Sequence, residues 1–306
     1  MHTSVLLNEC VQSLNLKDDS IIVDATLGYG GHSSEILKRI PKGFLYAFDQ
    51  DQDAIKSSQE RLAKIGSNYE IIYSNFVNMK TELAKRNVTK VDGILFDLGV
   101  SSPQLDEGER GFSFHADARL DMRMDKRNQL SAYEVVNEYD YEKLVEIFFK
   151  YGEEKYARNI AKRIVEERKT KKIETTLELA GIISASVPAK YKRDHHPARK
   201  VFQAIRIEVN DELNVLAKSL NYALDLIDIN GRICVITFHS LEDKICKDIF
   251  RENSTVKKEL ASLPIIPDEF KPKFRLEGII EPSKDEVQSN NRSRSAKARI
   301  IERIGK

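Results

Sequence analysis

The chain has 306 residues, of which 41% are hydrophobic and 32% are charged, and its formal net charge at pH 7 is +1. This length and apolar content favour two domains, or one large domain, with a proper core. The three cysteines are scattered and no C-x-x-C occurs, so neither a disulfide framework nor a zinc knuckle is supported. No signal peptide is predicted, and no apolar run approaches the ~20 residues that cross a bilayer, so we expect a soluble, cytoplasmic protein.

The first hundred residues alternate between apolar runs, typical of buried parallel strands, and helical patterns. Strands are predicted at 21–25, 44–48, 70–73 and 91–97, and helices near 31–40, 52–65 and 78–86. This alternation predicts an α/β fold with a doubly wound, mainly parallel sheet and right-handed crossovers.

The alternation stops after residue 97. Residues 98–130 are rich in Gly, Asp, Arg and Ser, and a loop of that length in a compact domain is usually functional. Helical patterns fill the chain from 131 to about 200, and one long helix is predicted over 203–228. A strand at 232–238, a helix at 241–252 and two closing strands at 274–280 and 296–304 follow.

The simplest organisation is one α/β domain with a helical insertion. Residues 1–105 and 206–306 form the α/β domain, and residues 106–205 form an all-helical insertion that we expect to recognise a nucleic acid. The insertion leaves from the carboxyl edge of the sheet, where ligands bind in such folds.

The stretch DATLGYGGHS, residues 24–33, joins a predicted strand to the next helix. Its glycines permit positive φ and close approach of a ligand to the backbone. Asp49 ends the second apolar run about twenty residues after Gly28, the distance at which an acid binds a ribose diol in doubly wound folds. The pattern predicts a cofactor that contains a nucleoside.

The glycine spacing discriminates between cofactors. It is G-x-G-G, and Ser33 stands where the third glycine of a dinucleotide fingerprint would fall. No G-K-[ST] follows, which excludes a P-loop. S-adenosylmethionine (SAM) has no phosphate and needs an acid, an apolar slot for adenine and backbone beside its methionine part. The residues therefore favour SAM, and a nicotinamide dinucleotide stays an alternative.

Three further side chains are candidates for the same crevice. Asp97 ends the predicted fourth strand, where it can accept hydrogen bonds from an amino group, and it is our candidate catalytic residue. A helix cap or a loop salt bridge is the alternative for Asp97. Phe76 suits an adenine ring, although ordinary core packing explains it equally well. Gln104 can supply one more polar contact.

Two stretches carry an excess of positive charge. Residues 155–206 contain 14 Lys or Arg against 5 Asp or Glu, and residues 289–306 contain 6 against 1. Such local fields attract polyanions, although solvated helix faces are the common alternative. Phe112 and Phe114 can stack on a base or anchor their loop to the core. The candidate RNA contacts are Arg110, Phe112, Phe114, Arg199, Lys200, Arg206, Arg292 and Arg294.

The cysteines and histidines limit the chemistry. Methylation of a pyrimidine carbon calls for a cysteine nucleophile, but the three cysteines lie in predicted helices and a strand, which favours a nitrogen acceptor. Adjacent His195 and His196 do not converge on one ion easily, so no metal site is predicted. Ser240 is expected to cap the helix after the fifth strand, with Asp243 completing a capping box.

These motifs belong to a longer pattern, because the chain resembles the RsmH (MraW) family of bacterial 16S rRNA methyltransferases along almost its whole length. The matching stretches include DATLGYGGHS, DGILFDLGVSSPQLDEGERGFSF at 92–114, LDMRMD at 120–125, HPARKVFQAIRIEVNDEL at 196–213 and FHSLEDK at 238–244. Small departures lie at Asn291 and Ala298, where Pro and Leu are expected.

The resemblance implies SAM-dependent methylation of the exocyclic N4 amino group of one cytidine in 16S rRNA, near the P site of the small ribosomal subunit. It implies a class I, Rossmann-like methyltransferase domain with an inserted helical domain. It assigns the cofactor contacts to Gly30, Gly31, His32, Asp49, Phe76, Asp97 and Gln104. His32 enters this set through the resemblance alone.

Two other functions stay open. Ser33 and the missing second nucleotide half argue against a nicotinamide-dependent oxidoreductase. The acids at 24, 49 and 97 argue against a non-catalytic module that binds SAM and the ribosome. The sequence does not fix the oligomeric state, and a homodimer is one alternative.

Overall fold

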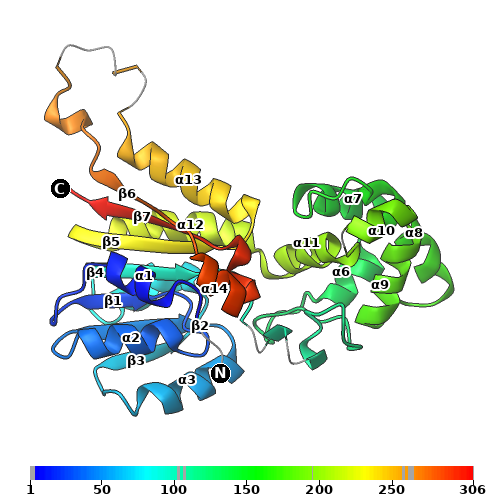
Figure 1. Ribbon diagram of the computed structural model, residues 1–306, viewed down its shortest axis with the longest axis horizontal. Helices are drawn as coiled ribbons and strands as arrows, with labels where there is room; N and C mark the ends of the chain where they lie inside the picture. The colour runs from blue at the N-terminus through cyan, green and yellow to red at the C-terminus, as the bar shows by residue number, and fades with distance from the viewer. Residues whose placement is uncertain are drawn as a thin grey trace. The chain divides into compact units, whose positions relative to one another are not determined.

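The computed structural model describes residues 4–101, 104–105, 108–194, 196–256, 259–260 and 265–305. The chain forms two compact units, whose elements are labelled in Figure 1. The sheet unit comprises Met1–Gly99 and Leu213–Lys306, and the helical unit comprises Val100–Glu212. The helical unit therefore begins six residues before the boundary predicted at 106 and ends seven residues after the one predicted at 205.

The sheet unit is built on seven strands in the order β3-β2-β1-β4-β5-β7-β6 (Figure 1). The first five strands in this order pair in parallel, whereas β7 pairs antiparallel with both β5 and β6. The doubly wound, mainly parallel sheet and the closing pair of strands are thus confirmed. The strands are β1 (Ile21–Asp24), β2 (Phe44–Asp49), β3 (Tyr69–Tyr73), β4 (Val91–Asp97), β5 (Ile227–Thr237), β6 (Phe274–Ile280) and β7 (Lys297–Arg303).

Apolar side chains are buried on both faces of this sheet. Successive side chains of a strand point to opposite faces, so Ile94 and Leu95 of β4 belong to different core clusters. One face is covered by α1 (Leu7–Ser13), α2 (Gly31–Arg39) and α3 (Gln52–Leu62). The other is covered by α4 (Met79–Ala84), α12 (Glu212–Leu226) and α13 (Ser240–Ser254). Burial on both faces explains why the strands are continuous apolar runs in the amino-acid sequence.

The remaining elements of the sheet unit are short. They are the helix α14 (Lys284–Ser289) and the 3₁₀ turns η1 (Phe76–Asn78), η3 (Asp268–Phe270) and η4 (Asn291–Ser295). No helix in the described ranges is both long enough and apolar enough to cross a membrane.

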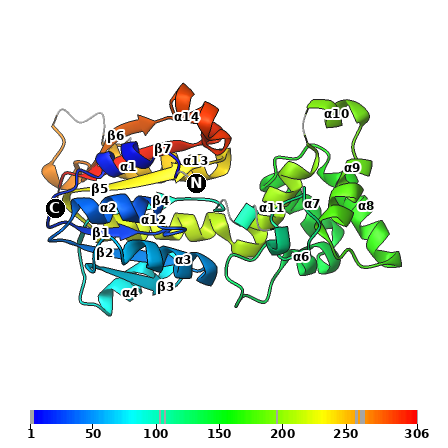
Figure 2. The ribbon, with the colours of Figure 1, turned by 60° about the horizontal axis from the view of Figure 1, so that its bottom comes forward.

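The helical unit has a hydrophobic core of its own. In it α7 packs against α8, and α8 packs against α9 (Figure 2). Its elements are η2 (Gly108–Arg110), α6 (Ala132–Glu138), α7 (Tyr141–Lys150), α8 (Ala157–Thr170), α9 (Thr176–Ala185), α10 (Ala189–Asp194) and α11 (Ala198–Asn210). Among its described residues the only β pairing is an isolated bridge between Arg119 and Thr175, which agrees with the predicted all-helical insertion.

The single helix predicted over 203–228 is wrong. The chain forms α11 and α12 there, separated at Asp211, whose φ of 50° is left-handed. Apolar residues continue on both sides of this break, so the periodicity alone does not reveal it. Strand β5 also begins earlier than predicted, at Ile227 rather than 232, because Ile227 pairs with Val91 before a register shift.

Candidate cofactor site

The loop between β1 and α2 is a tight bend that requires glycine. Gly28 and Gly30 have φ angles of 51° and 74°, a left-handed region that favours glycine. Gly31 has an ordinary φ, but a Cβ there would overlap Oγ of Ser4 from the N-terminal segment. The three glycines therefore serve two purposes, the turn itself and close packing beneath Ser4.

The bend is held by Asp49 at the end of β2. The carboxylate of Asp49 accepts hydrogen bonds from the N–H of Gly28 and the N–H of Asp51, both at 2.8 Å. Desolvation raises the pKa of Asp49 to about 6, although these two bonds favour its charged form. The ribose-binding acid predicted from the sequence is thus joined directly to the glycine bend.

Asp24, at the end of β1, has a structural role, because its carboxylate is bound to other groups of the chain. It is 1% exposed and accepts hydrogen bonds from Oγ of Ser33 at 2.6 Å and from the N–H of Thr26 at 3.1 Å. Burial raises the pKa of Asp24 to about 6. Ser33, which replaces the third glycine of a dinucleotide fingerprint, therefore anchors α2 to the end of β1.

Asp97 ends the neighbouring strand β4. Its backbone N–H donates to Oγ1 of Thr26 at 2.6 Å, which fixes the strand end beside the bend. Its side chain is 25% exposed, and one carboxylate oxygen lies 3.5 Å from Nδ1 of His32. Desolvation, with smaller repulsions from Asp24 and Glu242, raises the pKa of Asp97 to about 8.

The other predicted cofactor residues divide between the two units. Phe76 begins η1, just past the end of β3, and its ring packs edge-on against Phe96 of β4 with centroids 5.6 Å apart. Gln104 belongs to the helical unit, where its side-chain oxygen accepts from the N–H of Ser101 at 3.0 Å. Six of the seven predicted cofactor residues thus lie in the sheet unit.

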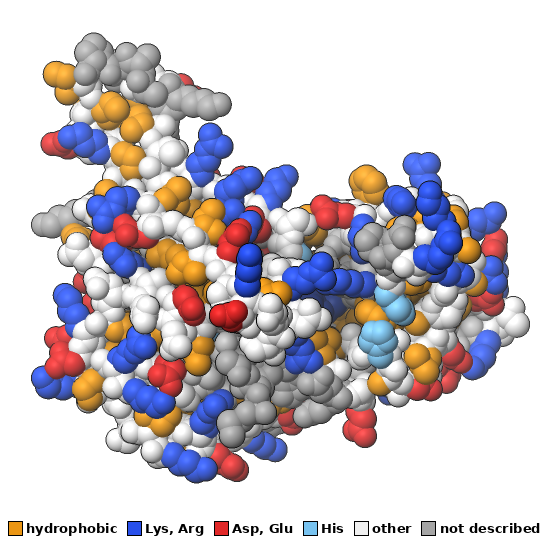
Figure 3. Space-filling view, viewed as in Figure 1, with side chains coloured by type: hydrophobic (Ala, Val, Ile, Leu, Met, Phe, Trp, Pro, Cys, Tyr) orange, Lys and Arg blue, Asp and Glu red, His pale blue; other side chains and the backbone are white. Residues whose placement is uncertain are grey.

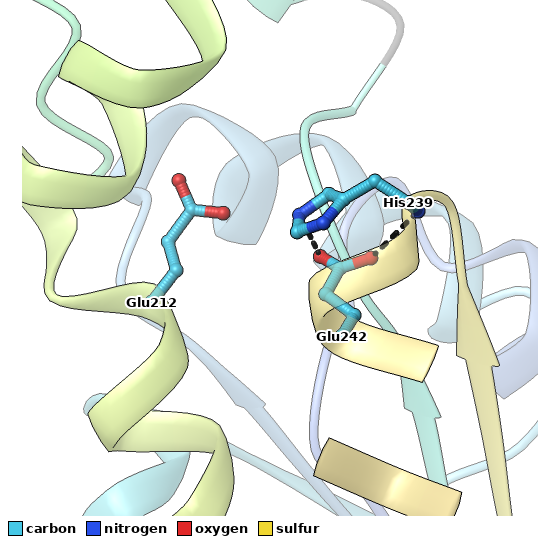
Figure 4. Close-up of side chains that lie close together, drawn as sticks. All are labelled: Glu212, His239 and Glu242. Atoms are coloured by element: carbon cyan, nitrogen blue, oxygen red, sulfur yellow. Dashed lines mark hydrogen bonds and ion pairs between the residues drawn. The ribbon is translucent and has the colours of Figure 1, made fainter. Parts of the chain in front are cut away.

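The end of β5 adds a pair of side chains that the sequence analysis did not assign to the site. Figure 4 shows Glu242 holding His239: one carboxylate oxygen lies 3.2 Å from Nε2 of His239, and the other accepts from its backbone N–H at 3.3 Å. The capping box predicted for Ser240 and Asp243 is wrong, since the N-cap residue of α13 is His239, and Glu242 accepts from its backbone N–H. Asp243 instead binds Arg299, at 2.7 and 2.9 Å.

Several predicted RNA contacts have partners within the protein. Arg110 is buried and donates to the carbonyl oxygens of Arg123 and Met124. Arg206 forms a two-pronged ion pair with Glu212, at 2.8 and 2.9 Å, with both side chains at most 15% exposed. These two arginines stabilise the helical unit, because their donors already bind groups of the chain.

The two phenylalanines of the loop are also packed. Phe112 is 6% exposed and belongs to the core of the helical unit. Phe114 stacks on the ring of His196, with centroids 4.2 Å apart, and its edge meets Phe202. In this structure both rings therefore anchor their loop to the core of the helical unit, which is the alternative to base stacking that the sequence left open.

Four basic residues of the predicted set remain outside the core. Arg199, Arg292 and Arg294 are exposed, and Lys200 is half-buried with its Nζ donating to the carbonyl oxygen of Glu153 at 2.9 Å. Figure 3 shows many further Lys and Arg side chains on the surface of the helical unit. Most of the positive charge predicted for residues 155–206 is therefore solvent-accessible.

A mainly parallel sheet in this order, with a glycine bend after β1 and acids at the ends of β2 and β4, defines a Rossmann-like, SAM-dependent methyltransferase. The chain belongs to the MraW methylase family, whose family model matches residues 1–304.

Similar proteins include a close relative and two solved structures. The chain is 55% identical to ribosomal RNA small subunit methyltransferase H of Exiguobacterium sibiricum over 306 residues, covering 99% of this chain and 98% of that protein. A solved rRNA methylase from Streptococcus thermophilus is 12% identical, with a TM-score of 0.45 over 97% of this chain and 93% of the other. A putative methyltransferase from Streptococcus mutans, in complex with S-adenosylhomocysteine (SAH), is 12% identical with a TM-score of 0.46 over 99% and 100% of the two chains.

Proposed function

We propose that the protein transfers the methyl group of SAM to the exocyclic N4 amino group of one cytidine in 16S rRNA, near the P site of the small ribosomal subunit. One structural observation supports the cofactor half of this proposal more than any other. The carboxylate of Asp49 is hydrogen-bonded to the N–H of Gly28, so the candidate ribose-binding acid is joined directly to the glycine bend. Family membership supports the methyl-transfer half.

Most residues of the site have a definite task in this proposal. Asp49 binds the ribose hydroxyls, and the backbone of Gly30 and Gly31 lies beside the methionine part. Phe76, held edge-on by Phe96, lies beside the adenine ring. The family resemblance assigns His32 and Gln104 to the cofactor contacts as well.

Asp97 acts on the acceptor. SAM supplies a methyl group on a positively charged sulfur. The N4 amine of cytosine is a weak nucleophile because its lone pair is conjugated with the ring, so it needs an acceptor that favours the reacting geometry. Asp97 accepts a hydrogen bond from this amine or from the cofactor and so holds both partners at near-attack distance.

The RNA surface in this proposal consists, in each unit taken by itself, of basic residues that lie outside the core. In the helical unit these are Arg199 and Lys200 on α11, and in the sheet unit they are Arg292 and Arg294 on η4. Arg110, Phe112, Phe114 and Arg206 support this surface from within, through the contacts described above. The target cytidine has to be unstacked or presented in single-stranded RNA.

The proposal places the protein in the cytoplasm with the small ribosomal subunit as its partner. A homodimer stays a prediction, which sedimentation equilibrium at micromolar concentration tests. Neither point affects the chemistry assigned to the site.

The function is tested by methyl transfer from tritiated SAM to small subunits that lack the modification, followed by nucleoside analysis. We expect one labelled methyl group per subunit, recovered as an N4-methylated cytidine. Label on carbon 5 would overturn the nitrogen acceptor. Binding of SAM without any transfer would favour the non-catalytic module, and a response to a nicotinamide cofactor instead would favour the oxidoreductase.

A further inference from the structure

His32 lies between the N-terminal segment and Asp97, and its two ring nitrogens have different partners. Nε2 lies 3.1 Å from the carbonyl oxygen of Val5. A carbonyl oxygen only accepts hydrogen bonds, so Nε2 carries a hydrogen. The side chain of His32 is nearly completely buried, and desolvation lowers its pKa to about 4. In a neutral imidazole the other nitrogen, Nδ1, then has a free lone pair.

This lone pair faces an oxygen of Asp97 at 3.5 Å. If Asp97 were ionised and His32 neutral, two acceptors would face each other in a poorly solvated place. A single proton turns the contact into an attraction, either as a carboxylic acid that donates to Nδ1 or as an imidazolium beside a carboxylate. In both cases the pair, and not one residue, holds one proton.

The groups around Asp97 favour retention of that proton. Asp24 on β1 and Glu242 on α13 both repel a negative charge on Asp97, and burial acts in the same direction. On α1, the negative charge of Asp97 contributes to raising the pKa of the buried thiol of Cys10. Within the described ranges, the only ion-pair partner of Asp97 is His32. The pKa of Asp97 is raised to about 8 as a result.

We infer that the His32–Asp97 pair holds one proton in the free protein, releases it to solvent when SAM binds, and keeps it when SAH binds. This inference rests on the proposed cofactor site, in which the sulfur lies close to Asp97. SAM carries a positive charge on its sulfur, and a cation next to a carboxylate favours the ionised form. SAH has an uncharged thioether, so its binding does not favour ionisation of the pair.

The consequence is a site that distinguishes substrate from product by charge. Binding of SAM creates a carboxylate that attracts the sulfonium and accepts from the amine. Methyl transfer breaks the bond between sulfur and the methyl carbon, leaving a neutral thioether, and forms the bond to N4, leaving a surplus proton on the amine. The carboxylate takes up this proton, and its attraction to the sulfur disappears. His32 is a positioning residue in this scheme, because it acts through Asp97.

The test is isothermal titration calorimetry of the full-length protein at pH 7 with SAM and with SAH, each in two buffers of different ionisation enthalpy. The dependence of the measured heat on the buffer gives the number of protons released. We expect about one proton per SAM and close to none per SAH, with the SAM value falling towards zero above about pH 9. SAH is a matched control, because it makes the same contacts with Asp49. Equal proton numbers for the two ligands would overturn the inference.

Variants locate the proton. Asp97→Asn is expected to abolish the difference between SAM and SAH, whereas Asp225→Asn, an exposed acid that pairs with Lys80, is expected to leave it unchanged. If Asp97→Asn does not fold, the ¹³C carboxyl shift of Asp97 in the wild-type protein answers the same question. We expect a protonated Asp97 at pH 7 that ionises on adding SAM. An Asp97 that is already ionised beside a neutral His32 in the free protein at pH 7 would contradict the inference.

The two proposals fail in different ways. If neither SAM nor SAH binds, the proposed cofactor site is wrong. If both bind and methyl transfer proceeds, but the proton numbers are equal, only the role of the His32–Asp97 pair is wrong.

Discussion

The carboxylate of Asp49 binds the backbone N–H of Gly28, 21 residues earlier in the chain, at a distance of 2.8 Å. This one hydrogen bond joins the end of β2 to the bend that follows β1. It orients the carboxylate of Asp49, so in the proposed cofactor site little conformational entropy has to be lost on binding a ribose.

Asp49→Ala should weaken binding of SAH. Loss of hydrogen bonds to a charged group costs ~1.5–3 kcal/mol, which corresponds to a rise in Kd of about tenfold to a hundredfold. Calorimetry with SAH measures this change. Asp18→Ala is the matched control, because Asp18 is exposed and pairs with Lys42 in a surface ion pair. Equal Kd values for the two variants would remove Asp49 from the cofactor site.

Gly31→Ala should displace the N-terminal segment. The added Cβ overlaps Oγ of Ser4, and overpacking of this kind costs ~1–3 kcal/mol. The double variant Ser4→Gly, Gly31→Ala should regain most of the lost stability, because the overlapping atom has been removed. Thermal unfolding of the two single variants and the double variant gives the coupling. Additive losses would show that Ser4 and Gly31 do not pack as described.

Asp97→Asn should reduce methyl transfer by about two orders of magnitude, the scale of losing a positioned electrostatic group. Binding of SAH should change little, because an amide has nearly the size of the carboxyl group. Single-turnover transfer and SAH titration measure the two effects separately. Full turnover by Asp97→Asn would exclude the proposed role.

The raised pKa of Asp97 also predicts how stability depends on pH. The folded protein holds this proton up to about pH 8, whereas an unfolded Asp loses it near its ordinary value of 3.8. Stability from this group is therefore present at low pH and falls as the pH rises between those two values. Asp97→Asn removes the effect, so its stability relative to wild type should grow from pH 5 to pH 8 in denaturant titrations. A constant difference would show that the pKa of Asp97 is not raised.

Charge removal at Arg199 and Lys200 should have a different effect from charge removal at Arg206, although all three residues lie on α11. Arg199→Ala and Lys200→Ala together should weaken RNA binding and reduce its salt dependence, by roughly one unit of logarithmic slope for each phosphate that is no longer neutralised. Arg206→Ala should instead lower the unfolding temperature of the protein, because it leaves Glu212 without this ion pair in a poorly exposed position. An unchanged salt slope in the Arg199, Lys200 variant would place the RNA surface elsewhere.

The strands of the sheet could be predicted because burial on both faces produces continuous apolar runs. The glycine bend and Asp49 could be predicted because their spacing has a direct geometric meaning. The break at Asp211 could not, since a single left-handed residue leaves the apolar pattern intact.

The partners of charged residues could not be predicted from the sequence. Arg110 and Arg206 look like the other basic residues of their stretch, and only the fold shows that their donors bind groups of the chain. In the sequence Glu242 likewise resembles any other acid of a helix. In the structure its carboxylate accepts hydrogen bonds from the N–H groups of Phe238 and His239, just after β5. Pairs of this kind are formed by tertiary contacts, which leave no periodic signal.

The central claim is that the glycine bend and the acids at positions 49 and 97 hold SAM. A crystal structure of the protein with SAH tests it most directly. We expect ribose hydroxyls on the carboxylate of Asp49, adenine beside Phe76, and the sulfur close to Asp97. SAH bound at another edge of the sheet, or with its ribose away from Asp49, would contradict it.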